Sequence, residues 1–247
     1  MPVTEIPYKF LVSAAPPERG NVTTSVTEQL RRAIVTLELK PGEVLDKGAI
    51  CERLGVSRFP VSEALARLQT EGLVDIMPQR GSMVSRVRIG DVVEYMLIRK
   101  ALESEAIRVL MAHRSDDVLE ELNTVLEEQA KAARKSDHET FHYLDVRFHE
   151  ILFESMHFSR VRAIIDSARA NLTRGRLLIL DRRRLQVTQS EHKAIVEAIA
   201  RGDTAGAVAA MRRHIDNVTQ EFIDFAHTRP ELFADPERLT DDLYVTD

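Results

Sequence analysis

Three histidines and one aspartate are spaced so that they could hold a metal ion. Asp145 and His149 are four residues apart, so on a helix they share one face, beside an apolar stripe. His192 and His214 each fall on the apolar face of a later predicted helix, an unusual place for a titratable group. Together these residues could bring one carboxylate and three imidazoles to one point. Such a donor set suits Zn²⁺, Ni²⁺ or Mn²⁺ and leaves positions open for water or a ligand.

Each of these four residues, taken singly, is more often an ordinary core or rim polar group. The metal hypothesis therefore depends on their combination. His138 and His142 share a helix face with Asp145, so either is an alternative ligand, although we interpret both as surface residues or as neighbours of the ligands.

Arg99 shares its predicted helix face with apolar residues, which is a poor place for an unpaired cation. Two anions could satisfy it. One is Glu103, four residues later on the same helix. The other is the carboxylate of a bound ligand, which a guanidinium can clamp with two hydrogen bonds. The residues alone leave both interpretations open.

A turn between two short predicted helices indicates a unit that reads DNA. At residues 54–57, Gly55 permits the left-handed conformation that a helix-turn-helix requires. The second helix of such a motif enters the major groove N-terminus first, which places Ser57, Arg58 and Phe59 at base edges or phosphates. Of these, Arg58 is able to make a bidentate contact with guanine.

A hairpin with predicted strands at residues 73–77 and 83–87 follows and would serve as a wing. Arg80 at its tip could reach a phosphate or the minor groove, and Gly81 would let the backbone approach closely. The same helices and hairpin could instead form a protein-interaction module, with Arg58 as a solvated charge. This alternative stays open on motif spacing alone.

These residues require two modules to position them, and the predicted fold is mainly α. The first module, a winged helix-turn-helix, carries predicted helices at residues 25–39 and 47–54 and from Ser57 to Gly72, followed by the hairpin. The second is an all-α bundle with short connections. Its six predicted helices span residues 91–113, 116–135, 137–156, 158–180, 185–201 and 203–226.

Charge and composition limit the classes of protein to which the chain can belong. The 247 residues contain 34 Lys+Arg and 39 Asp+Glu, a net charge of −5, which excludes a uniformly basic nucleic-acid coat. Residues 1–88 hold 12 of the basic and 10 of the acidic residues, so the excess of acid lies in the remainder. No run approaches the roughly 18 apolar residues of a membrane span. The single cysteine, Cys51, cannot form an internal disulfide and fits a reducing cytoplasm.

The sequence thus predicts four segments. A flexible N-terminal arm, without a secretory signal, is followed by the winged helix-turn-helix, by a helical domain for metal, effector and dimerisation, and by a peripheral acidic tail. Their predicted bounds are residues 1–21, 22–88, 89–227 and 228–247.

The stretch Leu-Gly-Val-Ser-Arg-Phe-Pro-Val-Ser-Glu-Ala-Leu-Ala-Arg-Leu-Gln-Thr-Glu-Gly-Leu-Val at residues 54–74, with Pro-Gln-Arg-Gly-Ser-Met-Val at 78–84, closely resembles the winged helix of the GntR family of bacterial transcription regulators. The resemblance implies binding to double-stranded operator DNA. Because a module with a net charge of only +2 binds phosphates weakly, a homodimer is expected, which would double the contacts and read a palindromic operator.

The chain departs from that family at positions that face DNA. The family usually has Thr at the place of Phe59 and Arg at the place of Ser62, and often Arg near the place of Gly48. The preferred operator is therefore expected to differ from the common family half-site. Lys47 and Arg67 would compensate in part for the missing contacts.

The later helices resemble the FCD ligand-binding domain of FadR-type GntR regulators. The resemblance rests on residues 189–203, on Ala207 and on Met-Arg-Arg-His-Ile at 211–215. In that domain an Asp-x-x-x-His pair and two later histidines commonly bind a metal. From the donor set, Zn²⁺ is the expected ion here, with Ni²⁺ or Mn²⁺ as alternatives. The ligands implied here are Asp145, His149, His192 and His214.

The resemblance covers about residues 22–226 and places an Arg near the effector pocket, which implies Arg99 as an effector-binding residue. Six predicted helices resemble the VanR-type subgroup more than the seven-helix FadR type. Phe158 stands roughly where the family often has Asn, which puts helix-start contacts in doubt but not the metal ligands.

The leading hypothesis is a transcription regulator, a repressor and not an enzyme, whose operator binding responds to a small organic acid held at the metal. A metal-dependent hydrolase is one alternative, because an open Zn²⁺ can activate water. Against it, His149-Glu150 is followed by Phe153 where a zincin would have its second His. The other alternative is a helical domain that only dimerises.

Overall fold

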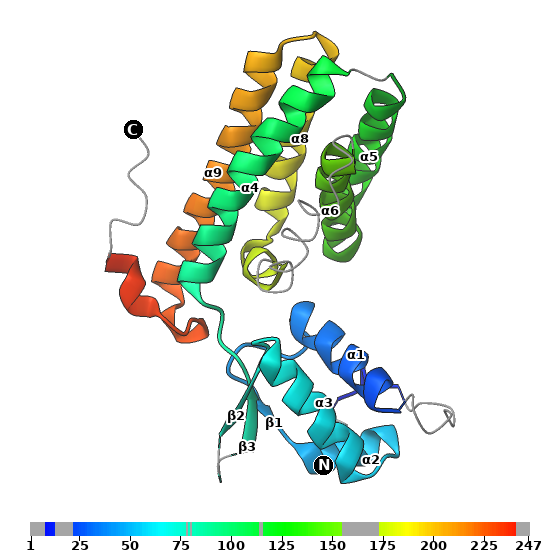
Figure 1. Ribbon diagram of the computed structural model, residues 1–247, viewed down its shortest axis with the longest axis vertical. Helices are drawn as coiled ribbons and strands as arrows, with labels where there is room; N and C mark the ends of the chain where they lie inside the picture. Colours follow the sequence, from blue (N-terminus) through cyan, green and yellow to red (C-terminus); the bar gives the residue numbers. More distant parts are fainter. Residues whose placement is uncertain are drawn as a thin grey trace. The chain divides into compact units, whose positions relative to one another are not determined.

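The computed structural model describes residues 8–12, 22–77, 79, 81–113, 116–154 and 173–240. The chain divides into two compact units, residues 1–88 with 229–236 and residues 89–228 with 237–247. The elements, labelled in Figure 1, are α1 (Val22–Val35), β1 (Val44–Leu45), α2 (Lys47–Leu54), α3 (Arg58–Thr70), β2 (Val74–Met77), β3 (Gly81–Val84), α4 (Ile89–Ala112), α5 (Asp116–Lys135), α6 (His138–Glu154), α8 (Arg182–Ala200), α9 (Thr204–Thr228), η1 (Pro230–Leu232) and η2 (Pro236–Thr240).

The first unit is the predicted winged helix-turn-helix. Asp46 caps α2, because its carboxylate accepts hydrogen bonds from two backbone N–H groups of the first turn. Gly55 ends that helix at a φ of 68°, in the left-handed region that a side chain would oppose. Ser57 then precedes α3 in an extended conformation. Both α1 and α2 pack against α3, which fixes the direction of its exposed face.

The wing is a three-stranded antiparallel sheet in which β3 lies between β1 and β2. Strand β1 was not predicted, because two residues carry no recognisable alternation. The second predicted strand begins earlier than expected, since Gly81 pairs with Met77 and the ladder ends at Val84. Gly81 has a φ of 90°, a backbone conformation that glycine adopts easily because it has no side chain. Arg80 lies outside the described residues.

Residues 8–12 differ from the flexible arm expected for the N-terminus. Leu11 is fully buried in the first unit. The guanidinium of Arg53 donates to the carbonyl oxygens of Tyr8 and Lys9, and the Tyr8 hydroxyl accepts from the backbone N–H of Asp46. This short segment is therefore a structural part of the DNA-reading unit.

The C-terminal segment also differs from the peripheral tail expected there. After α9, residues 229–236 rejoin the first unit, where Phe233 and Asp235 are buried. The backbone N–H of Val87 donates to Leu232, and the carbonyl of Val87 accepts from the N–H of Ala234. This pairing was not predicted from the sequence, because the segment is rich in proline and acidic residues, a composition typical of disorder.

The second unit is the predicted helical bundle, and its helices form a closed ring. Helix α4 packs on α9, α9 on α8, α8 on α5, α5 on α6, and α6 on α4 again. Each helix buries its apolar face toward its neighbours. Residues 173–179 are also helical, within the predicted span 158–180. The remainder of that span that precedes them, including Phe158, lies outside the described residues.

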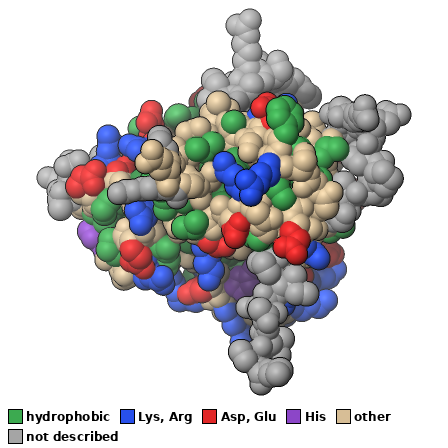
Figure 2. Space-filling view, turned by 90° about the horizontal axis from the view of Figure 1, so that it is seen from below, with side chains coloured by type: hydrophobic (Ala, Val, Ile, Leu, Met, Phe, Trp, Pro, Cys, Tyr) green, Lys and Arg blue, Asp and Glu red, His purple; other side chains and the backbone are tan. Residues whose placement is uncertain are grey.

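Basic and acidic side chains are interspersed on the face of the molecule that Figure 2 presents. This face is therefore not uniformly positive. Among the described helices, none is long and apolar enough to cross a membrane.

Candidate metal centre and DNA-reading face

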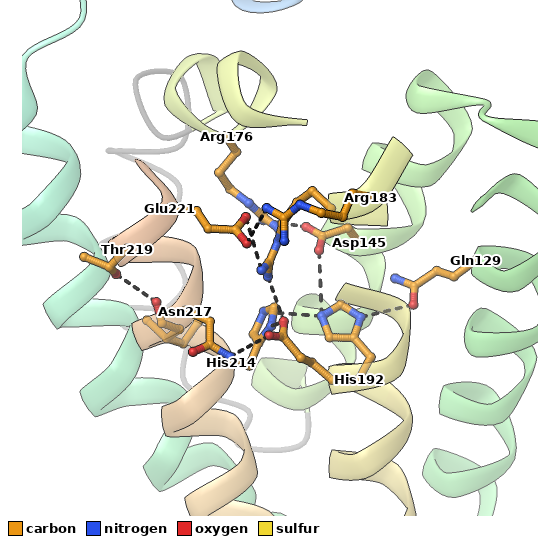
Figure 3. A network of polar contacts seen from close by, with 12 residues as sticks. Gln129, Asp145, Arg176, Arg183, His192, His214, Asn217, Thr219 and Glu221 are labelled. Atoms are coloured by element: carbon orange, nitrogen blue, oxygen red, sulfur yellow. Dashed lines mark hydrogen bonds and ion pairs between the residues drawn. The ribbon is translucent and has the colours of Figure 1, made fainter. Parts of the chain in front are cut away.

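The imidazoles of His149, His192 and His214 converge inside the helical ring, as the four-residue pattern predicted. They come from α6, α8 and α9, and all three are buried. The Nε2 atoms of His192 and His214 are 3.4 Å apart. Oδ1 of Asp145 lies 3.7 Å from Nε2 of His192 and 3.9 Å from Nε2 of His149. Three helices thus bring three imidazoles together with one carboxylate beside two of them, and Figure 3 shows Asp145, His192 and His214 of this group.

Each imidazole faces, at Nδ1, a side-chain oxygen from another helix of the ring. Nδ1 of His192 lies 3.1 Å from Oε1 of Gln129, and Nδ1 of His214 lies 2.8 Å from Oε2 of Glu191, both within hydrogen-bond geometry. Nδ1 of His149 lies 2.7 Å from Glu103 as an ion-pair contact, without hydrogen-bond geometry. An acceptor at Nδ1 favours the proton there and leaves the lone pair of Nε2 for a metal.

Burial keeps these imidazoles neutral. Desolvation lowers the pKa of His214 to about 4, although Glu191 opposes the shift. Desolvation likewise lowers the pKa of His149, and that of His192 well below its usual range. At neutral pH each ring is therefore uncharged and has a lone pair on one nitrogen, the form in which histidine binds a metal.

Asp145 has one carboxylate oxygen on each side of the centre. Oδ1 faces the imidazoles, while Oδ2 forms an ion pair with the guanidinium of Arg176, which follows in the helical residues 173–179. Burial alone would raise the pKa of Asp145, but the positive charge of Arg176 holds it well below its usual range. The carboxylate is therefore ionised and able to act as a ligand.

The donor set fits a divalent metal. Buried polar atoms normally have hydrogen-bond partners, yet Nε2 of His149 and Oδ1 of Asp145 have none. Ligands about 2.1 Å from a tetrahedral ion lie about 3.4 Å from one another. The Nε2 atoms of His192 and His214 have this separation, and the ligand atoms of the three histidines all lie within 4.8 Å of one another. Nitrogen and one carboxylate oxygen suit zinc or another first-row ion. These four residues would hold it.

Glu191 links His214 to a wider charged network. Its Oε2 accepts from Nδ1 of His214 and from the buried guanidinium of Arg184, and its Oε1 accepts from the amide of Asn217. Arg184 also lies 3.4 Å from Glu221. The position of the His214 ring is thus fixed by four other side chains.

Arg99 takes the intrahelical partner that the sequence offered. Its Nε donates to Glu103 at 2.6 Å, and both side chains are almost completely buried, at 3% and 0% exposed. Nη1 of Arg99 nevertheless has no hydrogen-bond partner. Arg99 and Glu103 also line a small pocket of about 40 Å³ beside the imidazoles. The other lining residues are Tyr95, His142, Val146, His149, Glu150, Phe153, Thr173 and Arg176.

The two alternative histidine ligands lie away from the centre. His138 is exposed at the start of α6, and His142 lines the pocket without joining the convergent group of Nε2 atoms.

Among the residues predicted to contact DNA, four are exposed around the first turns of α3, namely Ser57, Arg58, Phe59 and Ser62. The Ser57 side chain makes no capping hydrogen bond to the helix. Lys47, Arg67 and Gly81 are at least partly exposed, and Arg67 lies 3.5 Å from Glu63.

Sequence reasoning missed the residues that hold the ligands. Gln129 and Glu191 carry no motif of their own, although Glu191 directly precedes His192. Arg176 could have been noticed, because it opens the apolar run Leu-Leu-Ile-Leu that follows it. A charge at the edge of a buried face suggests a buried partner.

Comparisons with known proteins agree with this architecture. Residues 22–84 match the family model "Bacterial regulatory proteins, gntR family", and residues 94–217 match the FCD domain. A Streptomyces ambofaciens protein described as an uncharacterized HTH-type transcriptional regulator in an unstable DNA locus is 35% identical over 83% of this chain and 87% of its own. The Escherichia coli K12 transcriptional repressor RspR is 27% identical over 87% of this chain and 96% of its own.

The crystal structure of a putative GntR transcriptional regulator from Rhodococcus sp. RHA1 has a TM-score of 0.69 at 23% identity, covering 82% of this chain and 97% of its own. At that identity the likeness concerns the fold. The family models and the Streptomyces relative identify the class of protein, and they indicate a DNA-binding regulator rather than an enzyme. The chain belongs to the GntR family of bacterial regulatory proteins and carries an FCD domain.

Proposed function

We propose that this regulator is a homodimeric repressor whose operator binding is controlled by a small organic acid at a metal centre in the helical unit. The observation that carries the proposal is the convergence of three neutral imidazoles and one ionised carboxylate, two of whose buried donor atoms lack hydrogen bonds. Zn²⁺ is the first candidate ion, with Ni²⁺ or Mn²⁺ as alternatives. A bound ion supplies a Lewis acid that attracts an anionic ligand.

The pocket beside the centre favours a carboxylate as effector. It is lined by the guanidinium groups of Arg99 and Arg176 and by the imidazole of His149. Its volume of about 40 Å³ corresponds to roughly three water molecules, which matches the carboxylate end of a small acid. Nη1 of Arg99, which is buried and lacks a hydrogen-bond partner, would donate to that carboxylate.

Helix α4 offers a direct route from this pocket to the DNA-reading unit. It carries Arg99 and Glu103, and it begins at Ile89, the residue after the last one of the winged helix-turn-helix. A ligand that shifts α4 would change how the two winged helices of a dimer match half-sites about 34–36 Å apart. We expect coupling of about 1–3 kcal/mol, or roughly 5–150-fold in operator affinity.

The repressor assignment draws on RspR, a relative that carries this word in its name. DNA contacts are assigned to Lys47, Ser57, Arg58, Phe59, Ser62, Arg67, Arg80 and Gly81.

The test measures metal content and DNA binding on the full-length protein. Metal is quantified by mass spectrometry after reconstitution with Zn²⁺, Ni²⁺ or Mn²⁺. Small mono- and dicarboxylates are screened by thermal shift, and each hit is titrated into a complex with duplex DNA selected from random sequence. We expect one ion per subunit, and an acid that stabilises only the metal-loaded protein and changes DNA affinity.

Two variants control for general damage. His192→Ala should lose both the metal and the response to the acid, whereas His227→Ala, an exposed histidine at the end of α9, should lose neither. If the wild-type protein bound no metal after reconstitution with any of the three ions, the proposal would be overturned. The helical bundle would then be interpreted as a dimerisation unit.

A further inference from the structure

Phe59 exposes an aromatic ring where the DNA-reading helix begins. Its side chain is 75% exposed, and it is the one large hydrophobic residue of α3 that is exposed. The other apolar side chains of this helix, Pro60, Val61 and Leu65 among them, are buried. Single exposed hydrophobic residues are common, so exposure alone assigns no role to Phe59. The residues around the ring on the helix surface supply the further argument.

Phe59 lies in a stripe of short side chains. Residues 59, 62, 63 and 66 are spaced so that they share one helix face, and all four are exposed. Ser62 and Ala66 are small, so a groove can approach the helix backbone closely beside the ring. Glu63 lies 3.5 Å from Arg67, which offsets its charge. The face is therefore open and nearly neutral, with Phe59 as its most prominent group.

The flanking charges suit the walls of a DNA groove. Arg58 is exposed next to the ring, and Lys47 at the start of α2 is partly exposed. Cationic side chains can bind phosphates, contacts that fix orientation without reading sequence. In a helix that enters the major groove N-terminus first, the ring of Phe59 would face the base edges. A phenyl group neither donates nor accepts a conventional hydrogen bond, so it cannot read the nitrogen and oxygen pattern of a base pair.

The one apolar group that ordinary bases present in the major groove is the C5-methyl of thymine. We propose that Phe59 is a specificity-determining residue that selects thymine, by contact with this methyl group, at one position of each half-site. The inference rests on the proposed DNA-reading role of α3 and adds to it the base that the chain's own aromatic residue would choose.

The test removes the methyl group and nothing else. Binding of the full-length protein is measured by fluorescence anisotropy on a duplex selected from random-sequence DNA. Each thymine is replaced in turn by deoxyuridine. Because burial of one methyl group corresponds to roughly a fourfold change in affinity, we expect about fourfold weaker binding at one thymine of each half-site and little change elsewhere.

Variants connect that position to the ring. Phe59→Ser should bind the thymine and deoxyuridine duplexes equally, while Phe59→Leu, which keeps an apolar side chain, should retain part of the difference. Thermal midpoints should stay unchanged in both, since the ring is exposed. A methyl effect of equal size in Phe59→Ser, or no sensitive thymine at all, overturns the inference.

Arg58→Ala separates this inference from the proposed DNA-reading role. It should weaken binding to every duplex while preserving the ratio between thymine and deoxyuridine. Unchanged affinity in Arg58→Ala together with no sensitive thymine would show that the face of α3 itself had been misassigned.

Discussion

Glu103 contacts Arg99 through one carboxylate oxygen and His149 through the other. The distances are 2.6 Å to Nε of Arg99 and 2.7 Å to Nδ1 of His149, and the Glu103 side chain is fully buried. Burial alone would raise the pKa of Glu103, but its two partners lower it to about 2. One carboxylate therefore joins the proposed effector residue to a proposed metal ligand.

This arrangement changes what a substitution of Arg99 can show. Arg99→Ala would leave the buried charge of Glu103 half-paired, at a cost of about 3–5 kcal/mol in stability. The double variant Arg99→Gln/Glu103→Gln removes both charges and should recover much of that loss, as urea unfolding would measure. It should still bind DNA, yet lose the carboxylate response in the anisotropy titration. A double variant that responds like wild type would mean that Arg99 serves only as the partner of Glu103.

Glu191 should determine how tightly the metal binds. Replacing it by Gln keeps the shape but removes the charge that orients His214, and loss of such a partner commonly lowers metal affinity about 10–100-fold. Competition against a chromophoric zinc chelator measures this change. Glu197→Gln, an exposed carboxylate on the same helix, is the matched control and should bind metal like wild type. Equal affinity in both variants would assign Glu191 a purely structural role.

Arg58→Ala should weaken binding to the selected duplex by about 1–3 kcal/mol, or roughly 5–150-fold, because it removes a bidentate base contact or a phosphate contact. Arg134→Ala makes the same charge change at an exposed position of α5 and should have little effect. Anisotropy titrations at two salt concentrations measure both variants. Equal losses from the two would point to a general electrostatic effect and against a contact by Arg58.

The metal-free protein should lose stability as the pH falls from about 6.5 toward 4. Burial lowers the pKa of His214 to about 4, whereas in the unfolded chain its pKa is near 6.5. Within this window the unfolded chain binds a proton that the folded chain does not, so acidification favours unfolding. The contribution of the neutral His214 ring to folding stability is fully present above pH 6.5 and is lost as the pH falls toward 4. Urea unfolding at pH 7, 6 and 5 measures the slope, which should be shallower in His214→Gln. An identical slope in that variant would show that His214 does not titrate as its burial indicates.

Much of this fold could be predicted because local residues determine it. Gly55 ends α2 in the structure as it does in the sequence, and the spacing of apolar residues by three and four positions revealed the long helices. The proposed metal donors were recognised for the same reason, since Asp145 and His149 are one helical turn apart, and the structure brings His149 together with His192 and His214. By contrast, Gln129 and Arg176 reach the centre from distant segments, and no spacing rule joins them to His192 or Asp145. The docking of Leu11 and Phe233 is equally non-local.

The pairing of residues 229–236 with Val87 has a consequence for the order of synthesis. Residues 89–228 of the helical unit lie in the chain between the two stretches that form the first unit. Domains generally fold as their residues emerge from the ribosome, N-terminal ones first, but this one lacks Phe233 until the helices of residues 89–228 have been synthesised. A chain that stopped before residue 229 would therefore carry an incomplete winged helix-turn-helix beside its helical bundle. Formation of the complete first unit thus depends on synthesis of the helices that separate its two stretches.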